Sequence, residues 1–387
     1  MGESAQPTRL LHISDLHLGK SLHGFPLIEE QEDMLGQILS IIDKVHPDGL
    51  IIAGDVYDKS VPREDAVTMF SYFLAEVESR SCPVYMIGGN HDSGRRLDFG
   101  DAILKKRNIH IAGAFKGDMD RIVVHDGFGD LNIYMLPYIK PSLVRPYFDE
   151  EIGSPDEAMR LILDRTKVDP GARNLLVSHQ FYLNSDVLPK QCESETSRAC
   201  VGGLDCISAS FLNSFDYVAL GHIHTAQKVG RETVRYCGTP LKYSLSEVND
   251  NKSVTIVSIY EKNHVEIDCI PIVPLRDVAR VKGTMESIRE QMAERPELKD
   301  MYVGVVLTEH VFEPEKQLRL LFDRILSIEF EVDNKRSDSG EMTIDIINNK
   351  TPQALFEEFY SKYTGRDLTV YQRETIDDII SGEGGRL

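Results

Sequence analysis

The stretch PVYMIGGNHD, residues 83–92, decides how this chain folds. Its first half is apolar, and its second half places an amide, an imidazole and a carboxylate in a row at Asn90, His91 and Asp92. A short apolar run that ends in glycines is typical of a strand buried in a parallel sheet. Ligand sites of such sheets form just beyond the carboxyl ends of the strands. The stretch therefore predicts a buried strand that leads directly into a site.

The flanking sequence repeats this alternation. Strands are predicted over residues 8–14 and 50–54, a helix over 28–45, and a second helix with Pro62 in its first turn and Val67, Phe70, Phe73, Leu74 and Val77 on its inner face. A β-α-β-α-β order predicts neighbouring parallel strands with helices packed outside them. Further strands are predicted over 131–137, 174–179, 217–222, 253–260 and 264–270. We expect an α/β fold of stacked β-sheets flanked by helices.

The pattern of predicted strands and helices changes near residue 271, and we predict that the chain is divided into three regions. Residues 1–271 hold the stacked sheets, and residues 275–348 form a small α+β domain after the prolines at 271 and 274. Residues 351–381 form C-terminal helices, the first of which carries one apolar face made of Leu355, Phe356, Phe359, Tyr360 and Tyr363. This face either packs on its own part of the chain or docks a partner, and its aromatic content favours docking.

Composition limits the class of protein. The 387 residues carry a net charge of −19 and no Lys/Arg block, so any binding of nucleic acid must be local or must depend on a metal or a partner. The six cysteines form no C-x-x-C pair, which predicts free thiols in a reducing compartment. Neither a signal peptide nor a run of about 18 apolar residues is visible, and we expect a cytoplasmic protein without a membrane span.

Five predicted strands end in side chains that bind metals or move protons. These side chains are Asp15 and His17, Asp55 and Asp58, Asn90 to Asp92, His179, and His222 and His224. Each motif alone occurs by chance, and a D-x-H pair usually lies in a solvated loop. The ordered set of five is far more specific. Because parallel strands present their carboxyl ends at one edge, we expect these groups to converge.

The donor types indicate which metal the site would bind. Imidazole and carboxylate groups with one amide and no thiolate suit Mn²⁺, Fe²⁺ or Zn²⁺ better than Mg²⁺ or Ca²⁺, which prefer oxygen ligands almost throughout. Seven or more candidates exceed the needs of one four-coordinate zinc ion. They suit two ions about 3.5–4 Å apart with a bridging carboxylate, as in two-metal phosphatases and nucleases.

The motifs resemble those of the calcineurin-like metallophosphoesterases and, among these, of the double-strand-break repair nucleases. The matching segments read HISDLHLGK, AGDVYD, GGNHD, VSHQF, DYVALGHIH and YCGTPLKYSLSE. The resemblance covers nearly the whole chain and is strongest over residues 9–260. It implies an αββα fold with a cap domain and C-terminal helices, and a two-ion site for which we expect Mn²⁺.

The resemblance also implies a role for each site residue. One ion would be held by Asp15, His17, Asp55 and His224, and the other by Asp55, Asn90, His179 and His222. His91 would stay off the metals and assist the leaving oxygen, which agrees with the chemistry because a proton donor must not be bound to a metal through its basic nitrogen. Asp92 would orient a ligand or His91 from behind. Asp58 would act similarly or take a direct catalytic part.

Some positions keep two interpretations. Lys20, Lys59, Arg95 and Arg96 follow ligand motifs and are candidate phosphate contacts, although solvated loop charges are equally ordinary. Cys192, Cys200 and Cys206 lie in a polar segment, and their spacing fits no zinc pattern. We predict a surface loop near the site for this segment.

As a function, the resemblance implies a metal-dependent DNA exonuclease/endonuclease subunit. Its partner would be an SbcC-type ATPase, whose coiled coil would bind the C-terminal helices, and it would form a homodimer, with helices in 62–106 as candidates for the interface. The acidic balance predicts weak DNA affinity for the isolated chain. A phosphodiesterase or phosphatase acting on small-molecule or protein phosphoesters is an alternative, against which the cap domain and docking helices argue. A non-catalytic scaffold for the ATPase is a further alternative. The intact ligand set argues against it, because a scaffold would not need these ligands.

Overall fold

The computed structural model describes residues 5–184, 189–193, 206–331, 356–357, 360–361 and 367–381. The chain divides into two compact units, Met1–Glu331 and Val332–Leu387. The finer division into 1–271, 275–348 and 351–381 stays a prediction. No helix in the described ranges is both long and apolar enough to span a membrane. Five cysteines are described, all with free thiols, and Cys200 lies outside the described ranges.

The first sheet of the larger unit has the strand order β16-β15-β1-β4-β5-β6. Its strands are β1 (Thr8–Ile13), β4 (Gly49–Ala53), β5 (Val84–Ile87), β6 (Ile109–Ala112), β15 (Ser253–Ile259) and β16 (Val265–Pro271). The four strands β1, β4, β5 and β6 run parallel, and β15 and β16 add an antiparallel hairpin beside β1. The strand predicted from PVYMIG is therefore confirmed as β5, and the strands predicted over 253–260 and 264–270 are confirmed as β15 and β16.

The second sheet has the order β13-β14-β12-β9-β8-β7. Its strands are β7 (Asp120–Asp126), β8 (Gly129–Leu136), β9 (Arg173–His179), β12 (Tyr217–Gly221), β13 (Gln227–Val229) and β14 (Arg231–Tyr236). Strands β8, β9, β12 and β14 are parallel, and β7 and β13 are antiparallel edges. The sequence analysis missed both edge strands because they are polar and only partly buried.

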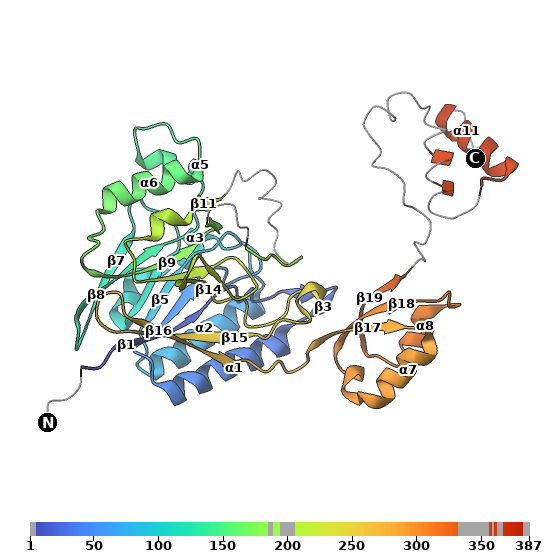
Figure 1. Ribbon diagram of the computed structural model, residues 1–387, viewed down its shortest axis with the longest axis horizontal. Helices are drawn as coiled ribbons and strands as arrows, with labels where there is room; N and C mark the ends of the chain where they lie inside the picture. Colours follow the sequence, from blue (N-terminus) through green and yellow to red (C-terminus); the bar gives the residue numbers. More distant parts are fainter. Residues whose placement is uncertain are drawn as a thin grey trace. The chain divides into compact units, whose positions relative to one another are not determined.

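The two sheets stack with helices on both outer faces, which confirms the αββα architecture (Figure 1). Helices α1 (Ile28–Val45) and α2 (Glu64–Ser79) cover the first sheet, and α5 (Pro141–Val144) and α6 (Pro155–Thr166) cover the second. Alternate residues of β1 show the layering, because Leu11 packs toward α1 and α2 whereas Leu10 packs toward the second sheet.

Two helices differ from the predictions. Helix α2 begins at Glu64 with Arg63 as its N-cap, so Pro62 precedes the first turn instead of lying in it. Val67, predicted to face inward, is 43% exposed, because it borders a surface groove rather than the core. Helix α6 was missed, although Ser154 and Glu157 form a capping box that its sequence already contains.

Shorter elements connect these layers. They are β2 (Ser21–Leu22), β3 (Phe25–Pro26), α3 (Gly94–Leu97), α4 (Asp101–Leu104), η1 (Lys105–Arg107), η2 (Arg145–Tyr147), β10 (Tyr182–Leu183), β11 (Ile207–Ser208), η4 (Ala209–Leu212) and η5 (Leu245–Glu247). Segments α3, α4 and η1 follow β5 and so extend directly from the stretch that ends in GGNHD.

A small domain follows the hairpin of β15 and β16. It consists of β17 (Val278–Gly283), α7 (Met285–Glu294), η6 (Pro296–Lys299), β18 (Tyr302–Leu307), α8 (Pro314–Leu318) and β19 (Arg324–Phe330). Its three strands are parallel, which the sequence analysis did not predict. The domain has a hydrophobic core of its own. The Tyr302 hydroxyl donates to Glu30 Oε1 of α1 over 2.9 Å, and Arg276 also pairs with Glu30. These bonds join the small domain to α1.

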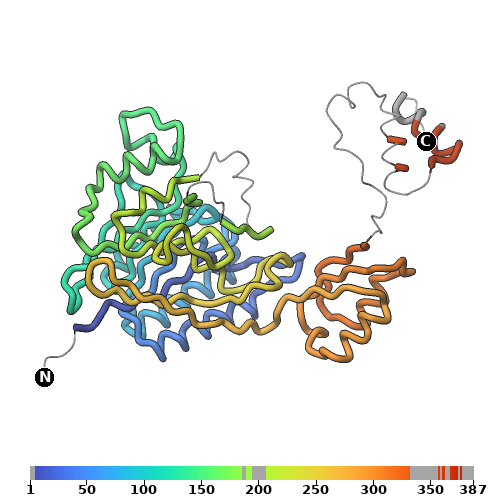
Figure 2. Tube along the Cα trace, in the orientation of Figure 1, coloured from blue at the N-terminus to red at the C-terminus, as the bar shows by residue number. Residues whose placement is uncertain are grey.

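The second unit contains α11 (Val370–Ser381), which is drawn at the red end of the trace (Figure 2). Of the five residues predicted to dock a partner, Phe356 and Tyr360 are described, and Phe356 is exposed. Leu355, Phe359 and Tyr363 lie outside the described residues. The Gln372 side chain donates to the Tyr360 hydroxyl over 3.3 Å, so α11 contacts the segment that carries the predicted apolar face.

Candidate metal centre

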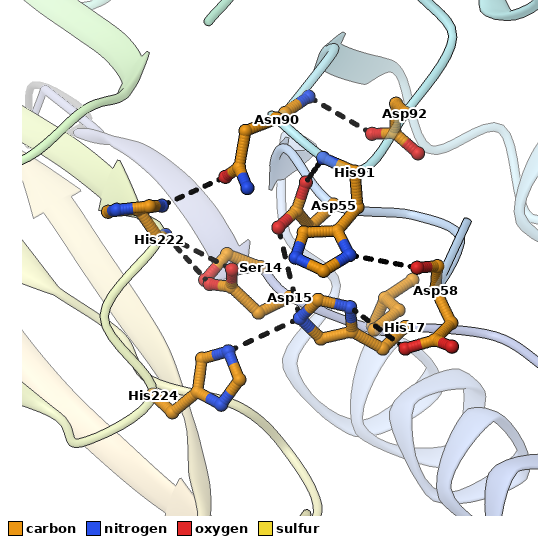
Figure 3. Close-up of polar contacts among 12 residues, drawn as sticks. Ser14, Asp15, His17, Asp55, Asp58, Asn90, His91, Asp92, His222 and His224 are labelled. Atoms are coloured by element: carbon orange, nitrogen blue, oxygen red, sulfur yellow. Dashed lines mark hydrogen bonds and ion pairs between the residues drawn. The ribbon is translucent and has the colours of Figure 1, made fainter. Parts of the chain in front are cut away.

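The polar groups that follow five strands meet at one place, as the strand order predicts (Figure 3). Strands β1, β4 and β5 deliver the first three groups from one sheet, and β9 and β12 deliver the others from the second sheet. His179 is the last residue of β9, and His222 directly follows β12. Both parallel runs present their carboxyl ends at the same edge of the sandwich, so all predicted ligands lie together.

The loops that carry these residues have unusual backbone conformations. Asp15, His17 and Asp55 have φ values of 53°, 43° and 50°, and His222 has a φ of 99°. Side chains with a Cβ avoid positive φ, and each such residue costs on the order of 1–3 kcal/mol. The loop after β1 and the loop after β4 are also hydrogen-bonded to each other, since the His17 N–H donates to the Asp55 carbonyl over 3.0 Å. Strain concentrated on four predicted ligands is typical of a site that is built for function.

Glycines make room for the ligand side chains. A Cβ at Gly89 would lie 2.1 Å from Asp55 Oδ1, and one at Gly54 would lie 2.3 Å from His179 Nδ1. Gly54 also has a φ of +91°. The glycines of AGD and GGNHD are therefore required because carboxylate and imidazole groups pack against the bare backbone.

One group of donors consists of Asp15, His17 and His224. One donor atom from each lies within 4.8 Å of the others, and all three residues are buried. The Nε2 atoms of His17 and His224 face each other at 3.2 Å. Burial lowers the pKa of His17 to about 3 and that of His224 well below its usual value, so both imidazoles are neutral at pH 7. Neutral imidazole is the form that binds metals.

The second group surrounds Asp55 and Asn90. His179 Nε2 lies 3.3 Å from Asp55 Oδ2 and 3.0 Å from Asn90 Oδ1, and His222 Nδ1 lies 2.9 Å from the same amide oxygen. His179 Nδ1 donates to the Ala53 carbonyl over 2.7 Å, which directs Nε2 toward the centre. This bond to the backbone fixes the ring in the manner usual for metal-binding histidines.

The two carboxylates strengthen the case for bound cations. Burial raises the pKa of Asp15 to about 7, although His179 opposes the shift. Burial acts in the same direction on Asp55, but the neighbouring His179 and His17 outweigh it and hold the pKa of Asp55 below its usual value. Burial would lower the pKa of His179, yet Asp55 and Asp15 raise it to about 9. Two buried carboxylates among nitrogen donors fit one or two divalent cations in both charge and ligand chemistry.

His91 lies at the mouth of the centre. Its Nδ1 donates to the Asp58 carbonyl over 2.8 Å, and its N–H donates to Asp55 Oδ1 over 2.8 Å. Its ring packs edge-on against His17, with the ring centres 4.8 Å apart. His91 also lines a cavity of 530 Å³ together with Asn90, Asp58 and Lys59. The side chain therefore stands between the buried donors and the space from which a substrate would enter.

Asp92 and Asp58 support the centre from outside. The Asp92 carboxylate accepts hydrogen bonds from the N–H groups of Val56, Tyr57 and Gly89, and so ties the loop after β4 to the loop after β5. The Asp58 carboxylate accepts from Lys20 Nζ at 2.7 Å and lies 3.9 Å from the buried His17 Nδ1. Both carboxylates contact the loops that carry the ligands.

Not every predicted phosphate contact lies equally close to the centre. Lys59 is exposed and lines the cavity at the mouth, and Lys20 is paired with Asp58. Arg95 and Arg96 are exposed in α3, where Arg96 lines a different groove. In the predicted cysteine loop, Cys192 Sγ lies 3.1 Å from Thr225 Oγ1, next to His224. Residues 194–205 of this loop lie outside the described ranges.

The sequence analysis missed a set of buried side chains behind His17 and His224. They are Gln31, Thr239, Tyr243, Glu247 and Lys252. The segment YCGTPLKYSLSE, which was noted only for its resemblance, contains three of the five. Polar and apolar residues are mixed throughout this segment, so no local pattern identified these three.

A family model described as calcineurin-like phosphoesterase matches residues 8–226, the range that contains all seven predicted ligands. The chain belongs to the calcineurin-like phosphoesterase family. This fold family implies binding of divalent metal ions, and the donor groups described above suit such ions. A second model, described as the C-terminal domain of a type 5 capsule protein repressor, matches residues 274–364.

Relatives of this phosphoesterase match over nearly the full length. Proteins named as the SbcD subunit of the nuclease SbcCD, from Staphylococcus epidermidis and Staphylococcus saprophyticus, are each 27% identical, over 379 and 380 residues. Each alignment covers 96% of this chain and 98% of the relative. Among solved structures, a dimetal phosphatase from Danio rerio matches at a TM-score of 0.41 and 13% identity, covering 69% of this chain and 98% of its own. A Thermus thermophilus protein matches at a TM-score of 0.39 and 9% identity, covering 68% and 99%.

Proposed function

We propose that this phosphoesterase is the metal-dependent DNA nuclease subunit of an SbcCD-type complex in DNA repair. The observation that carries the chemistry is the convergence of buried carboxylate, imidazole and amide donors at five strand ends, with His91 at their mouth. The DNA substrate is inferred from the relatives named SbcCD nuclease subunits, whose similarity extends through the small domain as well as the site. Such a role places the protein in the cytoplasm.

Two subsites are proposed within the centre. Asp15, His17, Asp55 and His224 would hold one divalent ion, and Asp55, Asn90, His179 and His222 the other, with Asp55 shared. When bound, the pair of ions supplies activation of a water molecule and neutralisation of phosphate charge. The donors suit Mn²⁺, Fe²⁺ or Zn²⁺, and among these we expect Mn²⁺ because of the resemblance to the repair nucleases.

His91 would assist the leaving group. Its Nδ1 proton is held by the Asp58 carbonyl, so the proton to be donated would come from Nε2 of the imidazolium form. Asp58 orients His91 through this carbonyl, while its carboxylate faces Lys20. Asp92 bonds both the loop that carries His91 and the loop that carries Asp55, and so fixes the position of one relative to the other. Lys59, Lys20 and Arg95 would meet phosphates of the substrate.

The partners follow from the same proposal. An SbcC-type ATPase would bind the C-terminal helices through the face that includes Phe356 and Tyr360. A homodimer would form through α2, α3, α4 and the link between α3 and α4, where Tyr72, Phe99 and Ile103 are 68%, 87% and 72% exposed. An apolar groove of 680 Å³ lies between these helices. Large exposed apolar side chains beside such a groove are typical of protein interfaces.

Comparing substrates in the presence and absence of metal tests the proposal. The purified chain, stripped of metal and reloaded with Mn²⁺ or Mg²⁺, would be assayed on linear duplex DNA and on a small phosphodiester, with and without the partner ATPase. We expect two bound ions per chain, higher activity with Mn²⁺, and DNA cleavage that the ATPase increases. Turnover of the small ester without any cleavage of DNA would instead support the alternative phosphodiesterase.

A further inference from the structure

Five buried polar side chains enclose the outer side of the donor group made by Asp15, His17 and His224. We call Gln31, Thr239, Tyr243, Glu247 and Lys252 the bracket. Each is 8% exposed or less, and none belongs to the proposed ligand set. Their hydrogen bonds reach the backbone of the ligand loops rather than the ligand side chains, so the bracket controls where the two histidines stand.

Gln31 holds the loop of His17. Its Nε2 donates to the His17 carbonyl over 2.8 Å, and its Oε1 accepts from the Gly19 N–H over 2.9 Å. Both ends of the amide are used, and a flipped amide would place oxygen against oxygen. Because Gln31 lies in the first turn of α1, the position of the His17 loop is fixed relative to a long helix.

Lys252 holds the loop of His224. Its Nζ donates to the His224 carbonyl over 3.0 Å, to Thr239 Oγ1 over 2.8 Å and to Glu247 Oε2 over 2.6 Å. These three bonds use all three protons of the ammonium group. The Thr239 N–H also donates to the His224 carbonyl, over 3.0 Å. One carbonyl therefore accepts from two groups that are both buried.

Tyr243 and Glu247 connect the two sides. Glu247 Oε1 accepts from the Tyr243 N–H over 3.2 Å. The Tyr243 hydroxyl donates to the Leu16 carbonyl and lies 3.4 Å from Gln31 Nε2. The Tyr243 ring packs edge-on against His17 with 5.6 Å between ring centres. The bracket is thus continuous from the carbonyl of one ligand to the carbonyl of the other.

The cost of burial suggests a role beyond stability. A buried ion pair such as Lys252–Glu247 rarely stabilises a fold more than apolar residues of equal volume would, because both charges lose their hydration. A directional network does, however, fix geometry that apolar packing leaves adjustable. Here the geometry that it fixes is the 3.2 Å separation between His17 Nε2 and His224 Nε2.

The same acidic residues could instead be taken for a separate metal site. Cys192, Glu247 and Asp250 place donor atoms within 4.8 Å of one another. Lys252 Nζ, however, lies 2.6 Å from Glu247 and 3.8 Å from Asp250. The ammonium group is already the cation of this cluster, which therefore needs no metal.

We propose that the bracket is a positioning device that sets the metal affinity of the Asp15–His17–His224 subsite. The inference rests on the proposed two-ion site. The other subsite is held by different contacts, since His179 is oriented by the Ala53 carbonyl and the His222 N–H is held by the Asp15 carboxylate. Loss of the bracket should therefore weaken one subsite and spare the other.

The test measures Mn²⁺ binding by the full chain with titration calorimetry and electron paramagnetic resonance. The double variant Lys252→Met/Glu247→Gln removes the ammonium group but keeps an oxygen for the Tyr243 N–H. We expect one dissociation constant to rise about ten- to a hundredfold with the other unchanged, as for other groups that orient metal ligands. The spectrum should change from that of a spin-coupled pair to the six lines of a single ion.

Matched variants locate the effect. Thr239→Val should weaken the same ion and Thr239→Ser should restore it, because serine keeps the hydroxyl. Gln31→Leu should act on the same subsite from the other side. Lys262→Met is the control, since Lys262 Nζ also bonds a carboxylate, that of Asp216 at 3.0 Å, and lies outside the bracket. In the double variant, adding His224→Ala should not change the remaining ion, whereas adding Asn90→Ala should weaken it.

The outcomes separate the two proposals. Wild-type protein that binds fewer than two ions would overturn the two-ion site, and the inference with it. Two tight ions in wild type and in every folded bracket variant would overturn the inference alone, and so would equal weakening of both ions. Circular dichroism identifies the folded variants, and the single substitutions at Thr239 and Gln31 carry the test if the double variant does not fold.

Discussion

His91 is the residue whose role separates most clearly from that of its neighbours. Its imidazole is fixed by the Asp58 carbonyl at the mouth of the centre, whereas Asn90 faces His179 and His222. We predict that His91→Ala retains two bound ions and loses about 10²–10⁴-fold in kcat on DNA, the usual contribution of a general acid. Metal analysis and single-turnover assays check this. His125→Ala, at a side chain that is 74% exposed, serves as control. Normal turnover with normal metal content would refute the role.

Gly89 tests whether the glycines of the motifs are needed for space. A methyl group there would lie 2.1 Å from Asp55 Oδ1. We predict that Gly89→Ala lowers the free energy of unfolding by on the order of 1–3 kcal/mol, as overpacking does, and weakens Mn²⁺ binding more than tenfold. Gly36→Ala is the matched control in α1, where nothing lies within 4 Å, and it should gain about 0.5–1 kcal/mol. Chemical denaturation measures both changes, and equal stability of the two variants would contradict the prediction.

At the scale of elements, the Asp126 carboxylate connects the two sheets, because it pairs with Arg173 in its own sheet and accepts a hydrogen bond from Thr8 in the other. Arg173 of β9 bonds both oxygens of Asp126 in β7 at 2.7 Å, and the Thr8 N–H of β1 donates to Asp126 over 2.9 Å. Burial would raise the pKa of Asp126, but Arg173 and Thr8 outweigh it and lower the pKa to about 2. The carboxylate is therefore charged in the folded state at a pH where the unfolded chain already binds a proton.

This shift predicts acid sensitivity with a definite sign. The stability that Asp126 contributes is present above pH 4, near the pKa of an unfolded chain, and is lost as pH falls toward 2. Its size is about 2 kcal/mol. We predict that Asp126→Asn removes this part of the pH dependence of unfolding between pH 4 and 2, whereas Asp130→Asn, at a side chain that is 66% exposed, leaves it. Denaturation curves over this range measure the difference, and parallel profiles of wild type and Asp126→Asn would contradict it.

At the scale of the whole molecule, the exposed Phe99 between α3 and α4 tests the proposed homodimer. Phe99 is 87% exposed beside the apolar groove. A charge there would have to be buried in the interface, so we predict that Phe99→Glu weakens dimerisation at least tenfold in sedimentation experiments. Phe312→Glu changes an equally exposed phenylalanine of the small domain, 84% accessible, and should leave the dimer intact. Equal effects of the two substitutions would exclude this interface.

The net charge of the whole molecule leads to a second prediction, which concerns DNA binding. The net charge is −19 and the sequence has no Lys/Arg block, so the isolated chain as a whole repels the DNA backbone. We predict weak DNA binding by the lone subunit, and much tighter, salt-dependent binding with the ATPase partner. Fluorescence titrations over a series of salt concentrations measure both cases. Tight and salt-sensitive binding by the chain alone would contradict the prediction.

Much of the site could be predicted because its signals are local. Hydrophobic runs identified β1, β4, β5, β9 and β12, and parallel strands bring their carboxyl ends together. Helix α1 was predicted with its observed bounds, since its apolar spacing is strong over 18 residues. Edge strand β7 and helix α6 were missed, because partial burial weakens periodicity and the capping box was not used.

The sequence alone determined which residues could bind metal and that they lie at strand ends, because side-chain chemistry and strand periodicity are properties of short segments. The tertiary structure decided how these residues are held. His17 and His224 face each other although they are 207 residues apart in the sequence. The bracket behind them links α1 to the segment after β14. Contacts of this kind depend on how two sheets and a helix pack, and no local pattern encodes them. The stretch that ends in GGNHD predicted candidate site residues, and the packing of the fold determined which side chains each of them contacts.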